Sequence, residues 1–187
     1  MAVHECEQGS ALFGALNMDS VPADGKELVA GMSDVFGFVP NLGYALGAEP
    51  AVLDVYIKML QALGQTVLDP IARQVALCAA SRANGADYAI AVHATLASKL
   101  GASKEIVDTI RNGGSFEDPK LEAVRRFTAA IASKRTQVSD SDVKALVAAG
   151  YDRRAAVALA LAAGAKTLAN AVAHLARPSV DAGFQPQ

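Results

Sequence analysis

Histidine is the side chain in this sequence best suited to proton transfer near neutral pH, because the pKa of a free imidazole lies closest to neutrality. The 187 residues contain three histidines, His4, His93 and His174. His93 lies in the middle of the apolar segment 88–96, which has the character of a helix. An imidazole there is either a general acid or base, or a core or interface histidine whose hydrogen bonds are satisfied by the protein.

A second group of polar side chains lies near the C-terminus. Lys166, Asn170 and His174 follow one another at four-residue steps, which places them on one face of a helix. The rest of that helix is almost wholly alanine, valine and leucine. The polar stripe is therefore either the exposed side of the helix or the lining of a polar cleft or subunit interface, and exposure is the simpler interpretation.

The two cysteines, Cys6 and Cys78, are too few for a disulfide framework or a four-cysteine zinc site. Cys78 falls on the expected buried face of its helix, and Cys6 lies in an N-terminal arm, so a relay between them is not expected. The sequence carries no phosphate loop, dinucleotide fingerprint, Gly-x-Ser-x-Gly turn or zinc signature. We therefore expect neither a metal nor a cofactor.

The charge balance narrows the class of partner. The chain has 17 Lys+Arg and 19 Asp+Glu, a net charge of −2. Nucleic acids and anionic membrane surfaces favour a basic excess, so neither is an expected partner. No run of 18 apolar residues is free of charge, and the first residues lack the basic region of a signal peptide. We expect a soluble, cytoplasmic protein whose partner is a small molecule.

Helices must position these side chains, because alanine supplies 39 of the 187 residues and is the best helix former. We predict an all-α fold in which the Asp-Pro pairs at 69–70 and 118–119 mark helix starts. The expected helices cover residues 26–35, 50–63, 70–83, 87–100, 103–112, 118–134, 139–149 and 152–176. The chain then divides into an N-terminal arm (1–25), a single helical domain (26–176) and a C-terminal tail (177–187) with a frayed end.

A family resemblance is carried by the segment Pro70-Ile-Ala-Arg-Gln-Val-Ala-Leu-Cys-Ala-Ala-Ser-Arg-Ala-Asn-Gly-Ala-Asp-Tyr-Ala-Ile-Ala-Val-His93. Three other segments agree with it: Phe38-Val-Pro-Asn-Leu, Glu49-Pro50 and Val147-Ala-Ala-Gly-Tyr. It resembles the core of the carboxymuconolactone decarboxylase / alkylhydroperoxidase D-like (AhpD-like) family. The likeness covers about residues 26–176. It implies an AhpD-like helical bundle and a homo-oligomer, either a trimer or a hexamer.

The peroxidase branch of that family carries Cys-x-x-Cys-x-x-x-His, with a glutamate twelve residues before the first cysteine. By this resemblance, Ala86 and Ala89 stand at the positions of the two redox cysteines. Gln74 stands at the position of the glutamate, and His93 is retained. Alanine cannot attack a peroxide, and glutamine cannot relay a proton at neutral pH. The resemblance therefore excludes a dithiol peroxidase mechanism at this site.

The decarboxylase branch lacks the cysteine pair and acts without cofactor or metal on small cyclic carboxylates. The resemblance then implies that His93 is the proton-transfer group, with Gln74 and Tyr88 orienting the imidazole or the substrate. The residues expected to bind the substrate are Arg73, Arg82, Lys166 and Asn170.

Three interpretations of function follow. The favoured one is cofactor-free acid/base chemistry, decarboxylase- or isomerase-like, on a small organic substrate. The second is a non-catalytic ligand-binding or scaffold protein derived from an alkylhydroperoxidase. The third retains peroxidase activity through Cys78.

Overall fold

The chain folds as a bundle of helices with no strand in the described part of the molecule, which in this computed structural model comprises residues 10–134 and 136–185. The α-helices are α1 (Lys26–Ala30), α2 (Ser33–Phe36), α3 (Asn41–Leu46), α4 (Pro50–Gly64), α5 (Pro70–Ala83), α6 (Asp87–Lys99), α7 (Lys104–Asn112), α8 (Pro119–Ser133), α9 (Asp140–Ala148) and α10 (Arg153–Ala176). Short 3-10 turns are η1 (Met18–Ser20), η2 (Ala23–Gly25) and η3 (Ala182–Phe184). The predicted all-α fold class is confirmed.

Local capping explains why most predicted helix bounds agree with the structure to within one or two residues. The carboxylate of Asp69 accepts a hydrogen bond from the amide of Ala72, and proline occupies the first helical position of α5. Asp118 caps α8 in the same way, and Ser139 forms a reciprocal capping box at the start of α9. These side chains satisfy amide groups that a helix start would otherwise leave unpaired.

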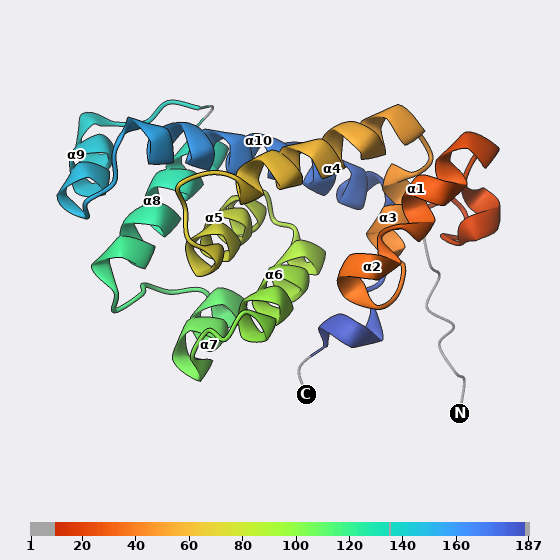
Figure 1. Cartoon of the computed structure of the whole chain (residues 1–187), viewed down its shortest axis with the longest axis horizontal. Helices are drawn as coiled ribbons and strands as arrows, with labels where there is room; N and C mark the ends of the chain where they lie inside the picture. Colours follow the sequence, from red (N-terminus) through yellow and green to blue (C-terminus); the bar gives the residue numbers. More distant parts are fainter. Residues whose placement is uncertain (1–9, 135, 186–187) are drawn as a thin grey trace.

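Helix α10 is the central element of the bundle. It runs behind α4 along the length of the molecule, with α8 and α9 at one end and α1 to α3 at the other (Figure 1). Ala162, Ala165 and Ala169 are fully buried on it, and their small side chains let α4, α5 and α8 pack against it. By length and composition α10 could cross a membrane, but half of its apolar window is buried inside the fold. The apolar sequence of α10 thus suits a core helix.

Two early segments differ from the prediction. The single helix expected over residues 26–35 is divided into α1 and α2, because the amide of Met32 donates to the carbonyl of Val29, three residues back, and interrupts the α-helical pattern. Helix α3 was not predicted. A Cβ at Gly43 would lie 2.6 Å from the sulfur of Met32, so a larger residue there would require the flexible side chain of Met32 to shift.

The expected frayed C-terminus is wrong for the residues that the structure describes. The chain turns back after α10, so that η3 lies beneath α2 (Figure 1). Phe184 is only 1% exposed and packs against the rings of Phe36, Phe38 and Tyr88. The carboxylate of Asp181 accepts hydrogen bonds from the hydroxyl of Tyr88 at 2.6 Å and from the amide of residue 41 at 3.1 Å. Aromatic burial and a charged acceptor therefore fix the tail.

The N-terminal arm also packs on the domain from residue 10 onward. Leu16 and Val21 are buried, and the amide of Ser10 donates to the carbonyl of Ala176 at 2.9 Å. The predictions for His4 and Cys6 lie outside the described residues.

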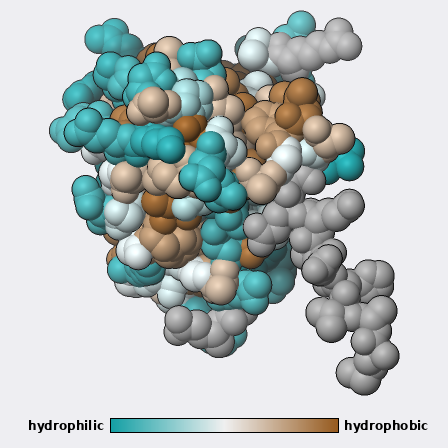
Figure 2. All heavy atoms as spheres, turned by 90° about the vertical axis from the view of Figure 1, so that its right-hand side faces the viewer, coloured by the Kyte–Doolittle hydropathy of each residue, from teal (hydrophilic) through white to brown (hydrophobic). Residues whose placement is uncertain are grey.

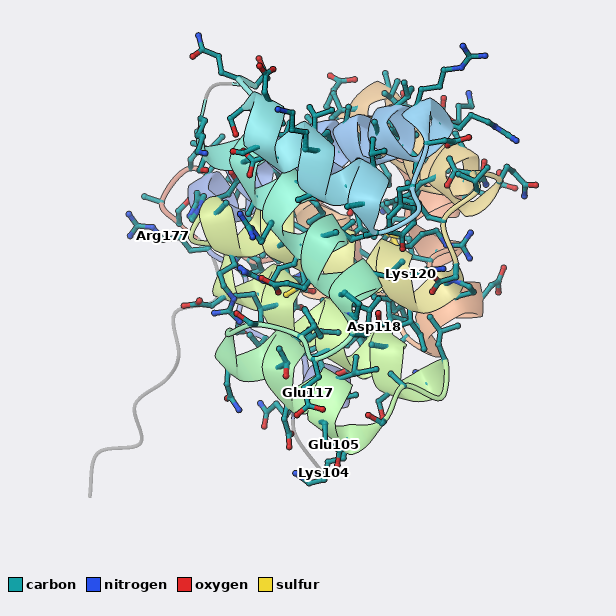
Figure 3. The ribbon with its side chains drawn as sticks, turned by 90° about the vertical axis from the view of Figure 1, so that its left-hand side faces the viewer. Lys104, Glu105, Glu117, Asp118, Lys120 and Arg177 are labelled. Carbon is teal, nitrogen blue, oxygen red and sulfur yellow. The ribbon has the colours of Figure 1, made fainter. Side chains whose placement is uncertain are left out.

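Two ends of the molecule differ in surface character. The face at the end with α1 to α3 carries apolar patches between polar ones (Figure 2). At the opposite end, charged side chains around α7 and the start of α8 point outward (Figure 3). Those labelled in Figure 3 at that end are Lys104, Glu105, Glu117, Asp118 and Lys120.

We predict that Phe184→Ala lowers the free energy of unfolding by about 3–5 kcal/mol, because it empties the aromatic cluster beneath α2. Urea denaturation measures the change. The matched control is Gln185→Ala at an exposed neighbour, which should change the free energy by less than about 0.5 kcal/mol. Equal stability of the two variants would show that the tail does not fold onto the domain in solution.

Candidate functional site

A cavity of about 890 Å³ lies among α1 to α6 and receives one residue, Lys166, from α10. Such a volume suits a small organic molecule. Most of the lining is apolar and includes Leu28, Met32, Phe36, Leu42, Leu46, Ile57, Leu60, Leu77, Val92 and Leu96. The predicted site residues that line it are Arg73, Gln74, Tyr88, Ala89, His93 and Lys166.

His93 and Gln74 form a hydrogen-bonded pair in the cavity wall. The imidazole is 4% exposed, and its Nδ1 lies 2.9 Å from Oε1 of Gln74. Because an amide oxygen only accepts, Nδ1 carries the hydrogen in this arrangement and Nε2 carries a lone pair. Nε2 is buried and has no hydrogen-bond partner among the described residues. The pair thus presents a fixed but unused hydrogen-bond acceptor.

The surroundings of His93 disfavour its charged form. Burial lowers the pKa of the imidazole well below its ordinary value of 6.5, and the nearby charge of Lys166 lowers it further. At neutral pH His93 is therefore a neutral imidazole. It can accept a proton or a hydrogen bond at Nε2, but the imidazolium needs a negative charge beside it.

Lys166 is a buried lysine that pairs with no carboxylate among the described residues. The side chain is 2% exposed, and no ion pair of Lys166 occurs within residues 10–134 and 136–185. Its ammonium nitrogen lies 6.0 Å from the centre of the Tyr56 ring. Burial lowers the pKa of Lys166 to about 8, a shift that the neighbouring Cys78 partly opposes. Both protonation states are thus accessible near neutral pH.

The exposed interpretation of the stripe on α10 is therefore wrong for two of its three residues. Asn170 is 1% exposed, and neither polar atom of its amide has a partner within the described chain. Asn170 is not a lining residue of the large cavity. Only His174 is exposed, with its Nε2 2.8 Å from the carbonyl oxygen of Asn84. Lys166 and Asn170 are buried because they lie on the side of α10 that packs against other helices, whereas Gly164, Thr167 and Ala171 on its other side are exposed.

Tyr88 is held as an anchor in the cavity wall. Its hydroxyl donates to Asp181 and accepts from the amide of Leu42 at 3.3 Å. Burial raises the pKa of Tyr88 well above its usual range, and the bond to Asp181 raises it further. The phenol stays protonated, and its hydrogen is already engaged. The geometry thus favours a positioning role over proton transfer.

The two arginines differ in position. Arg73 lines the large cavity, and its guanidinium donates to the carbonyl of Gly64. Arg82 lies elsewhere and donates at 2.8 Å to the carbonyls of Ile110 and Arg111, in a separate hollow of about 300 Å³. The structure therefore does not bring Arg82 together with the other predicted site residues.

Cys78 lines that second hollow and is buried. Its thiol lies 3.5 Å from the carbonyl oxygen of Ile110. Burial raises the pKa of Cys78 to about 11, despite opposing effects of Arg82 and Lys166. A thiol protonated at neutral pH is a poor nucleophile, so this environment does not favour the peroxidase interpretation.

Ala86 and Ala89, the two positions that the resemblance equates with redox cysteines, lie just before His93 on the chain. Ala89 precedes His93 by one helical turn and lines the cavity, whereas Ala86 is buried at the start of α6. Within the described ranges, no group of three or more His, Cys, Asp or Glu side chains could hold a metal ion.

Some lining residues escaped the sequence analysis. Asp24, Glu27 and Asp34 line the cavity from the segment around α1 and α2, and Tyr56 faces Lys166 from α4. No local pattern identifies the three acidic residues, because the segment joins the site only through tertiary packing. The contact of Tyr56 with Lys166 also arises through tertiary packing, so it could not be inferred from the sequence.

Comparison with known proteins agrees with this fold. Residues 50–130 match the model of the Carboxymuconolactone decarboxylase family. No protein of curated function matches the sequence. The AhpD core of a peroxidase-related protein from Ralstonia eutropha JMP134 has a TM-score of 0.79 at 20% identity, covering 92% of this chain and 93% of that one. A peroxidase-related protein from Silicibacter sp. TM1040 has a TM-score of 0.76 at 18% identity, with coverage of 92% and 93%.

A debrominase has the same fold. A cysteine-to-alanine variant of Bmp8, solved in complex with 2,3,4-tribromopyrrole, has a TM-score of 0.74 at 16% identity and covers 94% of each chain. At such identities the likeness concerns the fold, whereas the family rests on the sequence match. Taken together, these similarities confirm the resemblance seen in the residues: residues 50–130 match the carboxymuconolactone decarboxylase family, and the fold is AhpD-like.

Proposed function

We propose that the large cavity binds a small, mostly apolar organic molecule and that His93 moves a proton to or from it without a cofactor. The observation that carries this proposal is the buried, unpartnered Nε2 of His93 in the wall of a cavity of about 890 Å³. A buried acceptor without a donor is costly, and a bound molecule would supply the missing partner.

The residues have distinct roles in this proposal. Gln74 accepts from Nδ1 and so keeps the lone pair at Nε2. Nε2 takes a proton from carbon next to a carbonyl, and the electron pair of that C–H bond moves to the carbonyl oxygen. The ammonium form of Lys166 stabilises the resulting enolate, whose negative charge in turn offsets the cost of the imidazolium. Where the substrate also has a conjugated C=C bond, the enolate extends over it, and return of the proton to the γ carbon gives isomerisation.

The lining supports the substrate class. Apolar side chains form most of the wall, and the cations Arg73 and Lys166 could bind a carboxylate. The complex of Bmp8 with 2,3,4-tribromopyrrole supports a ring of that size as a ligand of the shared fold. Arg82 and Asn170 are not part of this proposal because neither lines the cavity.

A second candidate function is ligand binding without catalysis. It is favoured by the lowered pKa of His93, because a buried imidazole with a low pKa is a weak base. In that case Nε2 would only accept a hydrogen bond from the ligand.

Three further expectations stay predictions from the sequence: a homo-oligomer (trimer or hexamer), a cytoplasmic location and the lack of nucleic-acid or membrane partners.

The proton-transfer role predicts carbon-bound hydrogen exchange. Small cyclic ketones and unsaturated lactones, with and without a carboxylate, are incubated with the protein in D₂O and followed by proton NMR. We expect the protein to exchange at least one of them faster than buffer, and His93→Gln to slow that exchange by about 10²–10⁴-fold.

The matched control is His174→Gln, which removes a histidine outside the cavity and should exchange as the parent protein does. Exchange at the parent rate in His93→Gln would contradict the proposal. Binding of the compounds with no exchange above buffer would instead identify the second candidate function.

The pKa of His93 also predicts how stability depends on pH. Since its folded-state pKa lies below 6.5, the unfolded chain binds more protons at this residue in acid. The free energy of unfolding should fall as the pH drops below about 6.5, by up to ~1.4 kcal/mol per pH unit. Urea denaturation between pH 7 and 5 measures this. His93→Gln should make the free energy of unfolding depend less on pH, and His174→Gln should leave the pH dependence unchanged. A pH dependence in His93→Gln as steep as in the parent protein would show that another group causes it.

A further inference from the structure

We propose that Lys166 is a nucleophilic amine that captures small aldehydes and ketones in the cavity as an imine. Lys166 is the residue of the central helix α10 that lines the large cavity. Its side chain is 2% exposed, so it is reached through the cavity rather than from the outer surface.

The groups around Lys166 leave its nitrogen uncommitted. Tyr56 faces it from α4, and Cys78 from α5 and His93 from α6 are within electrostatic reach. All three are neutral at pH 7, because burial raises the pKa of the phenol and the thiol and lowers the pKa of the imidazole. No carboxylate of the described chain forms an ion pair with Lys166.

Other lysines of the chain show the contrast. Lys58 pairs with Asp54 at 2.6 Å, Lys104 pairs with Asp108, and Lys134 lies 3.6 Å from Asp142. Each of these side chains is more than half exposed. Paired or hydrated ammonium groups keep their protons, whereas a desolvated amine loses its proton more readily. A large fraction of nucleophilic neutral amine near pH 8 is therefore expected at Lys166.

The reaction is a condensation that needs no external oxidant or reductant. The lone pair on Nζ forms a bond to the carbonyl carbon while the C=O pair moves to oxygen. The carbinolamine then loses its oxygen as water, together with the two amine hydrogens, and leaves a C=N bond to Lys166. The apolar wall favours small apolar carbonyl compounds. This inference shares the cavity with the proposed function but does not depend on proton transfer by His93.

Reductive trapping tests the inference. The full-length protein is incubated with benzaldehyde and sodium cyanoborohydride at pH 7, which converts an imine into a stable secondary amine. Intact mass and peptide mapping then locate the added benzyl group. We expect labelling of Lys166 to be on the order of tenfold faster than at any exposed lysine, with a rate that is half-maximal near pH 8.

Three variants separate the possible outcomes. Lys166→Met should lose the fast label, and Lys99→Met, at an exposed lysine on α6, should keep it. His93→Gln should also keep it, even though carbon exchange is lost, so that failure of one proposal is distinguishable from failure of the other. A label spread evenly over surface lysines, or fast labelling that survives in Lys166→Met, would overturn the inference.

Stability at alkaline pH provides a test that requires no ligand. Between about pH 8 and 10.5 the unfolded chain binds more protons at Lys166 than the folded protein does, so stability should rise with pH in this window. Thermal melts of the parent protein and Lys166→Met should therefore converge as the pH rises, with the variant melting several degrees higher at pH 7. Tyr56 and Cys78 are present in both proteins, so the difference isolates Lys166. If the melting temperatures of the two proteins instead differed by the same amount at every pH, the amine would not be desolvated in solution, and the inference would be overturned.

Discussion

The arrangement of the site depends on one constraint: polar groups are enclosed in an apolar helical core without enough partners to satisfy them. Gln74 satisfies only Nδ1 of His93, and Lys166 has no ion pair in the described chain. Such groups cost stability unless something else completes them. A cavity bordered by these same groups is where a ligand would do so.

Alanine makes this enclosure possible. The small side chains along α10 let neighbouring helices approach closely, so a lysine and an asparagine in the middle of the helix are cut off from water. The C-terminal tail contributes to the same wall. Asp181 fixes the hydroxyl of Tyr88, and Tyr88 lines the cavity beside Ala89 and His93. The tail therefore affects the geometry of the site although it holds no reacting group.

The helix starts could be predicted from the sequence, because they depend on contacts between residues that are close together in the chain. Asp69, Asp118 and Ser139 cap helices through bonds to amides two or three residues away, so their helices begin where expected. The family resemblance implied that Gln74 orients either the substrate or His93, and the structure places its Oε1 2.9 Å from Nδ1 of His93. The sequence could not show which face of α10 packs against the other helices, and exposure of Lys166 was therefore the wrong interpretation. Position in three dimensions also decides that Arg82 binds backbone carbonyls away from the cavity and that Phe184 anchors the tail.

The protonation state of His93 is the central claim, and nitrogen-15 NMR of the imidazole at pH 7 tests it most directly. The structure predicts a neutral ring with hydrogen on Nδ1 and a lone pair on Nε2, and a change in the Nε2 chemical shift when a cavity ligand binds. A ring that is positively charged at pH 7, or that carries its hydrogen on Nε2, would contradict this account.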